Sequence, residues 1–149
     1  MILYYLDLAD YLTFVAVVTG LGVATVVRLA DVGLADSALH APQAGWSDYD
    51  LYPGFVDKAA VLAVRLTKNH ALPDGNKRAG WVALRLFVEL NEWEWTDFPT
   101  VDDAERAMLA VASGEWDEAA LAEWLRPRLG PRFEGDWPTP GESTADRSC

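Results

Sequence analysis

Hydrophobic residues recur at helical spacing in two stretches in the middle of the chain. Those of the first stretch are Phe55, Ala59, Leu62, Ala63 and Leu66. Their spacing of i, i+4, i+7, i+8 and i+11 is the stripe of an amphipathic helix. The same spacing returns between residues 79 and 90, where Trp81, Leu84 and Val88 add apolar residues on the other faces. The pattern predicts two successive helices, the second buried on most sides and central to the fold.

The flanking regions add shorter elements. Residues 10–29 are apolar and rich in β-branched side chains, a composition that suits a helix or a strand, and Gly20 and Gly22 are expected to break this segment. We predict further helices over residues 34–41, 101–112 and 117–125, the last with Asp117 as its N-cap. Residues 43–54 carry Gly, Ser, Asp and Pro, which predicts a loop or a short hairpin. Residues 91–99 end the central helix and suit an extended segment.

Together these elements predict an all-α domain of about six helices. A chain of 149 residues, 51% of them hydrophobic, has the size and composition of one domain. From residue 130 onward the sequence is dense in Pro, Gly and Ser and has few core residues. We therefore expect a domain over residues 1–129 and a flexible or partner-ordered tail over residues 130–149.

Charge and cysteine content narrow the functional classes. The formal charge of −11 argues against a broad nucleic-acid surface, so a site for a polyanion must be local. The single cysteine, Cys149, allows neither an internal disulfide nor a cysteine metal cluster, which fits the cytoplasm. Asp7 and Asp10 interrupt the apolar N-terminus and no basic segment precedes it, so we expect neither a membrane helix nor a signal peptide.

The chemistry is concentrated in the stretch NHALPDGNKRAGW, residues 69–81, which joins the two central helices. The first turn of a helix presents unpaired N–H groups and about half a positive charge, and so binds anions. Gly75 allows close approach of the backbone, Asn76 is expected to cap the helix, and Lys77 and Arg78 add two cations. Cations at a helix N-terminus are unfavourable unless an anion is bound. The predicted ligand is a phosphate chain.

Two residues of this loop suit catalysis on a nucleotide. Asp74 next to a polyphosphate can hold Mg²⁺, which is commonly bound by one or two carboxylates with phosphate oxygens and waters. His70, placed where the preceding helix should end, can take the proton of an attacking hydroxyl. Together they predict transfer of part of a nucleotide to a hydroxyl. Taken singly, each residue has a simpler interpretation as a turn, a cap or a solvated charge.

The segment HALPDGNKR resembles the signature loop of the Fic/Doc proteins, H-x-F-x-[DE]-x-N-[GK]-R. The lysine at position 77 resembles the death-on-curing (Doc) branch of the family, whereas the Fic branch has glycine at this position of the motif. The resemblance extends over residues 31–126 through DVGLADSALHAPQ, DLYPGFVDKAAVLAVRLTKNH and NEWEW. It implies a compact Fic-type all-α domain.

The resemblance also implies a function. Death-on-curing proteins are toxins of type II toxin–antitoxin systems, and they are kinases that pass the γ-phosphate of ATP to a threonine of elongation factor Tu and halt translation. By this resemblance His70 is the general base, Asp74 holds Mg²⁺, and the phosphates are gripped by Gly75, Asn76, Lys77 and Arg78. A flap that aligns the target would contain Gln43, Gly45, Trp46, Ser47 and Tyr49. A Phd-like antitoxin would cover the groove with a helix, and the surface around Trp46 and Tyr49 is a candidate contact.

Departures from the family pattern leave two alternatives open. At the position after the histidine where the family has an aromatic residue, this chain has Leu72. Where the family more commonly has proline, this chain has Ala71. AMP-transferring members have a second arginine where this chain has Trp81, which disfavours AMP transfer. The alternatives to a kinase are an AMP-transferring enzyme of the same fold and a non-catalytic helical binding module.

Overall fold

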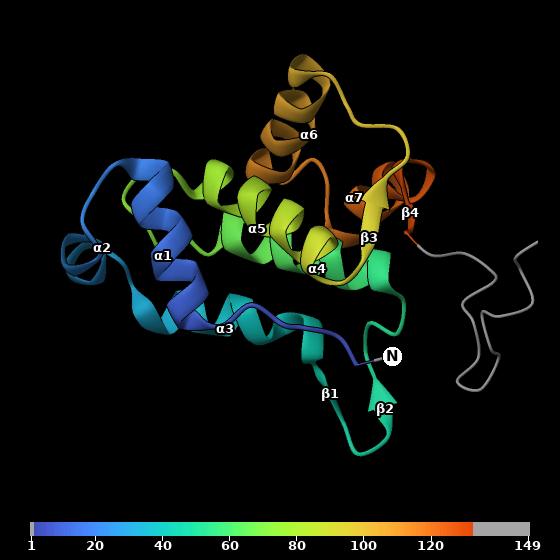
Figure 1. The fold of residues 1–149 in the computed structure, drawn as a ribbon, viewed down its shortest axis with the longest axis horizontal. Coiled ribbons are helices and arrows are strands. Elements are labelled where there is room, and N and C mark those ends of the chain that lie inside the picture. Colours follow the sequence, from blue (N-terminus) through green and yellow to red (C-terminus); the bar gives the residue numbers. More distant parts are fainter. Residues whose placement is uncertain (1, 133–149) are drawn as a thin grey trace, which may run out of the picture.

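A computed structural model of the chain describes residues 2–132 (Figure 1), and in this range seven α-helices form nearly the whole fold. The helices are α1 Leu8–Thr19, α2 Val23–Leu29, α3 Val32–His40, α4 Phe55–Lys68, α5 Asn76–Leu90, α6 Val101–Ser113 and α7 Glu118–Leu125. Two short 3-10 helices are η1 Ala41–Gln43 and η2 Arg126–Arg128. The strands are β1 Gly45–Trp46, β2 Tyr49–Asp50, β3 Trp93–Trp95 and β4 Leu129–Pro131. The all-α prediction is confirmed, with α2 as an additional helix.

Helices α4 and α5 pack against each other through the middle of the molecule (Figure 1). Helices α1 and α3 pack along one side of this pair, and α6 and α7 along the other. Both predicted helical stripes face the core, but α4 is buried around most of its circumference, whereas α5 leaves Arg85 and Leu90 exposed. The pair approaches closely at Gly80, where a Cβ atom would overlap Thr67 Oγ1 and lie 2.9 Å from the carbonyl oxygen of Ala63.

The apolar N-terminal region is helical on both sides of its glycine break. Helix α1 is capped by the Asp7 side chain and ends at Gly20, whose φ of 73° is in the left-handed region. Helix α2 begins after Gly22, so the predicted break is confirmed. Within residues 2–132, no single helix is long and apolar enough to cross a membrane, and α1 and α2 meet the length and composition criteria only as a pair bent by 103°.

Two short antiparallel strand pairs complete the fold, a hairpin and a pair that joins distant parts of the chain. Strands β1 and β2 pair Gly45 with Asp50 and Trp46 with Tyr49, as the turn-rich sequence predicts. Strands β3 and β4 pair Trp93 with Pro131. Strand β4 thus extends two residues past position 129, the expected end of the domain. The rest of the expected tail, from residue 133, lies outside the described residues.

A buried lysine attaches the first hairpin to the core. Lys58, on the first turns of α4, is only 3% exposed. Its Nζ donates to Asp50 Oδ2 at 2.7 Å and to the carbonyl of Pro42 at 2.8 Å. The hydrogen bond from Lys58 also lowers the pKa of the Asp50 carboxyl. Because Pro42 precedes β1 and Asp50 ends β2, one ammonium group holds both ends of the hairpin.

Candidate functional site

The loop between α4 and α5 begins with a backbone reversal at His70. Helix α4 ends with Asn69 as its C-cap, and His70 adopts a φ of 53°, which is uncommon for a residue other than glycine. The carbonyl of the next residue, Ala71, accepts a hydrogen bond of 2.7 Å from the N–H of Asp31, the N-cap of α3. The loop is therefore fixed to a neighbouring helix immediately after His70, whose side chain is exposed.

Asn76 does not cap α5, and the predicted capping role is wrong. The N-cap is Gly75, with a φ of 91°, and Asn76 is the first helical residue. The Asn76 side chain turns back onto the loop, where Oδ1 accepts from the Leu72 N–H at 3.1 Å and Nδ2 donates to the Leu72 carbonyl at 2.8 Å. Gly75 supplies the left-handed backbone conformation of this turn, which other residues rarely adopt. Asn76 therefore clamps the loop.

The first turn of α5 has the features that suit an anion. No side chain among the described residues caps this helix end. The N–H groups of the first turn point out of a helix without intrahelical partners, and the helix dipole adds positive charge there. Lys77 and Arg78, both exposed, follow directly. This end of the helix can hold a phosphate group.

Asp74 is an exposed carboxylate beside this helix end. Its Oδ1 accepts a hydrogen bond from the N–H of Gly75 at 2.8 Å, which fixes the side chain against the helix start. Nowhere in residues 2–132 do three or more His, Cys, Asp or Glu side chains gather as a metal cluster. Any metal held by Asp74 would therefore need most of its ligands from a substrate and from water.

One cavity of about 410 Å³ brings the predicted site residues of the loop together. Its lining consists of Thr67, His70, Pro73, Asp74, Gly75, Asn76, Lys77, Arg78 and Ala112. The imidazole, the carboxylate and the two cations thus border a single space. Residues of α4, α5 and α6 line this space together with the loop.

Sequence reasoning missed a second cavity, which adjoins the first. It has a volume of about 460 Å³, lies between α5 and α6, and shares Lys77 and Arg78 with the cavity above the loop. Most of its other lining residues are apolar, among them Trp81, Phe98 and Met108. The only signal in the sequence was the helical spacing of the apolar residues in α6, which does not reveal which helix α6 faces.

The structure does not bring the predicted flap to the loop. Helix α3 packs beside α4 in the opposite direction, so that Asn69 Nδ2 donates to the carbonyl of Leu34 at one end and Lys58 Nζ to that of Pro42 at the other. The hairpin that contains Gly45, Trp46, Ser47 and Tyr49, and Gln43 just before it, lies at the N-terminal end of α4 (Figure 1). The 14 residues of α4, roughly 21 Å of helix, separate it from the loop.

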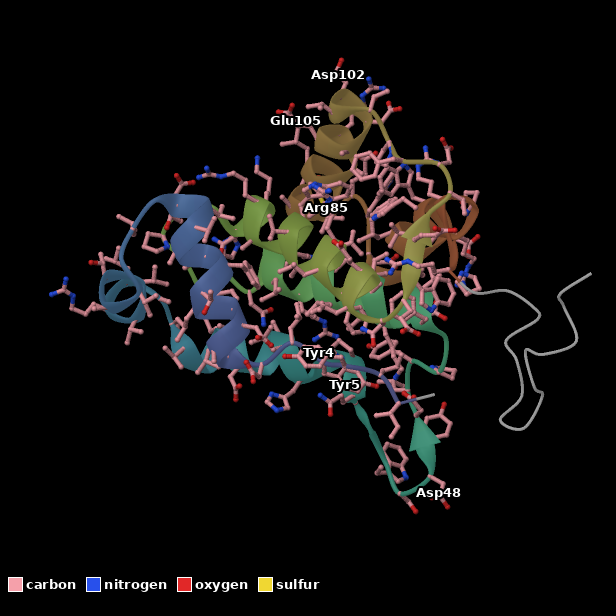
Figure 2. All side chains as sticks on the ribbon, in the orientation of Figure 1. Tyr4, Tyr5, Asp48, Arg85, Asp102 and Glu105 are labelled. Carbon is pink, nitrogen blue, oxygen red and sulfur yellow. The ribbon has the colours of Figure 1, made fainter. Side chains whose placement is uncertain are left out.

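The hairpin nevertheless presents an exposed aromatic surface. Trp46 is 77% and Tyr49 60% exposed, with their ring centroids 5.8 Å apart. Figure 2 shows Asp48 at the tip of this hairpin, pointing away from the helices. Exposed aromatic residues on a protruding element are typical of a protein contact.

Comparisons of the sequence with known proteins identify the family of the chain and a similar protein. The sequence model of the Fic/DOC family matches residues 5–88, which is more than half of the chain. The chain is also similar to a protein named Toxin Doc from Mycolicibacterium smegmatis (strain ATCC 700084 / mc(2)155). The two are 39% identical over 121 residues, which cover 81% of this chain and 90% of that protein.

Proposed function

The chain belongs to the Fic/Doc family, whose members transfer parts of nucleotides, and from this premise we propose that it is a Doc-type toxin that phosphorylates a protein. The reaction would pass the γ-phosphate of ATP to a threonine hydroxyl of elongation factor Tu and block translation in the cytoplasm. The observation that carries the proposal is the cavity bordered by His70, Asp74 and the cationic first turn of α5.

The residues present fit a nucleotide with Mg²⁺. The uncapped helix end with Lys77 and Arg78 suits a phosphate chain. Asp74 uses Oδ1 for the Gly75 N–H, and its second oxygen has no hydrogen bond from the described residues. Mg²⁺ usually takes one or two carboxylates and completes its shell with phosphate oxygens and waters, so a lone aspartate suffices. When bound, Mg²⁺ would neutralise charge on the phosphate oxygens.

The side chains of this loop would then divide the chemistry. His70 accepts the proton of the threonine hydroxyl while the threonine oxygen forms a bond to the γ-phosphorus. The bond between the γ-phosphorus and the bridging oxygen breaks, and ADP leaves. Lys77, Arg78 and the first-turn N–H groups hold the negative charge of the phosphates, which is the main contribution a protein makes to this reaction. Asn76 keeps the loop in shape.

Two positions favour phosphoryl transfer over AMP transfer. Lys77 supplies an ammonium group where the AMP-transferring branch has glycine. Trp81 stands where that branch has a second arginine, and its side chain lines the apolar cavity between α5 and α6. An indole in this position offers no charge to the outer phosphates of ATP, so support for AMP transfer is weak.

We further propose that a Phd-like antitoxin is the natural partner, since the similar protein is named as a toxin. A helix of the antitoxin would cover the groove beside the loop, and the aromatic surface of Trp46 and Tyr49 is a candidate contact. The hairpin would also contact a part of the target that lies away from the acceptor threonine. Its distance from His70 supports a docking role rather than one at the reacting atoms.

The test is the intact mass of elongation factor Tu after incubation with the purified chain, ATP and Mg²⁺. We expect a phosphate adduct, its loss in His70→Ala and Asp74→Ala, and its retention in His40→Ala, which changes the exposed histidine of α3. An adduct with the mass of AMP would refute phosphoryl transfer. Unchanged modification by His70→Ala would refute the catalytic role of the loop.

A further inference from the structure

A furrow between α5 and α6 continues the cavity above the loop away from His70. Ala112 of α6 lines the cavity above the loop, while Leu109, Glu105 and Val101 line the second cavity. These positions recur at intervals of three or four residues and so lie on one face of α6. The facing residues of α5, including Trp81 and Arg85, also lie on one face. The two cavities therefore form one path between the helices.

The path has the length of a nucleotide. From Lys77 to Arg85 the helix rises by roughly 12 Å, at 1.5 Å for each residue. At the loop end, the width of the cavity lined by His70 and Asp74 adds to this length. Volumes of about 460 and 410 Å³ for the two cavities lie within the usual range for small-molecule sites.

The chemistry of the furrow changes along this path. At the loop end it has the cations Lys77 and Arg78. At the far end the rings of Trp81 and Phe98 lie 6.3 Å apart, and the guanidinium of Arg85 lies 5.1 Å from the Phe98 centroid. The wall contributed by α6 is mostly apolar and includes Met108 and Leu109, with Glu105 as the one carboxylate in the lining. Figure 2 shows Arg85 and Glu105 on the same side of the molecule, from the two facing helices.

We infer that the nucleoside part of the nucleotide binds in this furrow, with its base against the rings of Trp81 and Phe98. This inference rests on the proposed function, because it assigns the phosphate chain to the loop. A ligand with an anionic tail and a flat aromatic head matches a path with cations at one end and aromatic rings at the other. The Glu105 carboxylate is available to accept a hydrogen bond from an amino group of the base. Arg85 would change from stacking on Phe98 to contact with the ligand.

The experiment compares ATP with inorganic tripolyphosphate, which has the phosphate chain but no nucleoside. Binding to the full chain is measured by calorimetry in the presence of Mg²⁺. We expect the wild type to bind ATP about 10- to 100-fold more tightly, because stacking of one base contributes about that factor. In Ala104→Trp an indole fills the furrow, and in Phe98→Ala a ring is removed. Both substitutions should reduce this preference to less than threefold while tripolyphosphate binds as before.

The matched control is Arg106→Trp, which adds the same indole to α6 at an exposed position outside the furrow. It should keep the wild-type preference for ATP. Thermal unfolding checks that each variant is folded. The two furrow variants act by different means, so either one, if folded, is enough to test the nucleoside site. A preference for ATP that survives both substitutions would overturn the nucleoside site alone. A wild type that binds ATP in the furrow but never phosphorylates a protein would overturn the proposed function alone.

Discussion

The single side chain of Asn76 organises the loop that carries His70. Both of its polar atoms are engaged with the backbone of Leu72, which is itself 6% exposed. The amide is therefore bound to the protein before any ligand arrives. We therefore expect its main contribution to a phosphate site to be indirect, through the shape of the turn and through the direction of the first N–H groups of α5.

Replacement of Asn76 by alanine should disorder the loop. The N–H and carbonyl of Leu72 lose their partners, at a cost of about 1–3 kcal/mol in the free energy of unfolding. Transfer should slow by about 100-fold, because a displacement of 1 Å in a catalytic group has that effect. Urea unfolding and hydrogen exchange of residues 69–76 measure the two effects. If Asn76→Ala weakened ATP binding and left exchange and stability unchanged, Asn76 would act on the ligand and the clamp would be wrong.

At the scale of elements, the close contact of α4 with α5 depends on Gly80. A methyl group at this position would meet Thr67 Oγ1, the Ala63 carbonyl and, at 3.4 Å, Met108 Cε. The Ala63 carbonyl is part of the backbone of the facing helix and cannot yield without moving it, and the Thr67 hydroxyl is held beside it by a hydrogen bond of 2.7 Å to that carbonyl. The loop that carries His70 connects the same two helices, so their separation also sets the geometry of the loop.

We predict that Gly80→Ala destabilises the protein by about 1–3 kcal/mol, although alanine is the better helix former by about 1 kcal/mol. The comparison is Gly33→Ala in α3, where a Cβ atom would meet only Asp31 Oδ1, at 3.5 Å. This second substitution should be neutral or slightly stabilising. Removing the hydroxyl in Gly80→Ala/Thr67→Ala should recover part of the loss. Equal melting temperatures for the two glycine variants would contradict the close contact.

The β1–β2 hairpin is an element without a core of its own, held at its base by Lys58. Two residues in each strand give too few hydrogen bonds for independent stability. The ammonium group of Lys58 therefore fixes the direction of the hairpin, and with it the position of the Trp46 and Tyr49 rings.

Lys58→Met keeps the buried stem and removes the ammonium group. It should leave the Pro42 carbonyl without a partner, lower the free energy of unfolding by about 1–3 kcal/mol and speed hydrogen exchange over residues 43–52. Asp57→Asn is the control, since Asp57 lies on the same helix and pairs with Arg126 at 2.8 Å instead of with the hairpin. A hairpin that exchanges equally slowly in Lys58→Met would rule out this anchoring role.

Local patterns in the sequence predicted the elements well and their packing less well. The stripes of residues 55–66 and 79–90 and the N-cap Asp117 correspond to helices α4, α5 and α7, because each depends on neighbouring residues alone. The clamp by Asn76 depends on the dihedral angles of Gly75. The position of the hairpin depends on the direction of α3 beside α4. Neither quantity is encoded in the spacing of residues, so the spacing alone revealed neither the clamp nor the place of the hairpin.

At the scale of the whole molecule, we expect the ionisation of one buried tyrosine to lower stability at high pH. Tyr11 of α1 is 1% exposed, and burial raises the pKa of its phenol from 10.0 to about 12. The folded state therefore holds the phenolic proton more tightly than the unfolded state does. This contribution is fully present below pH 10 and is lost as the pH rises from 10 to about 12.

By about pH 11.5 the loss should amount to about 2 kcal/mol, at about 1.4 kcal/mol for each unit of pH above the unfolded-state pKa of 10.0. Urea unfolding of the wild type and of Tyr11→Phe at about pH 8 and about pH 11.5 measures it. The wild type should lose more stability than the variant over this interval, because phenylalanine has no proton to lose. Parallel losses in the two proteins would show that Tyr11 does not govern alkaline unfolding.

The separation of the hairpin from His70 sets a minimum size for a substrate that uses both. An extended chain advances about 3.3 Å for each residue, so a peptide needs at least six or seven residues to cover the roughly 21 Å length of α4. Under the proposed function, a short peptide built around the acceptor threonine would reach the histidine but would not contact the aromatic rings. Fragments of a target are for this reason poor stand-ins for the intact protein, and a screen based on them would underestimate how selective the enzyme is.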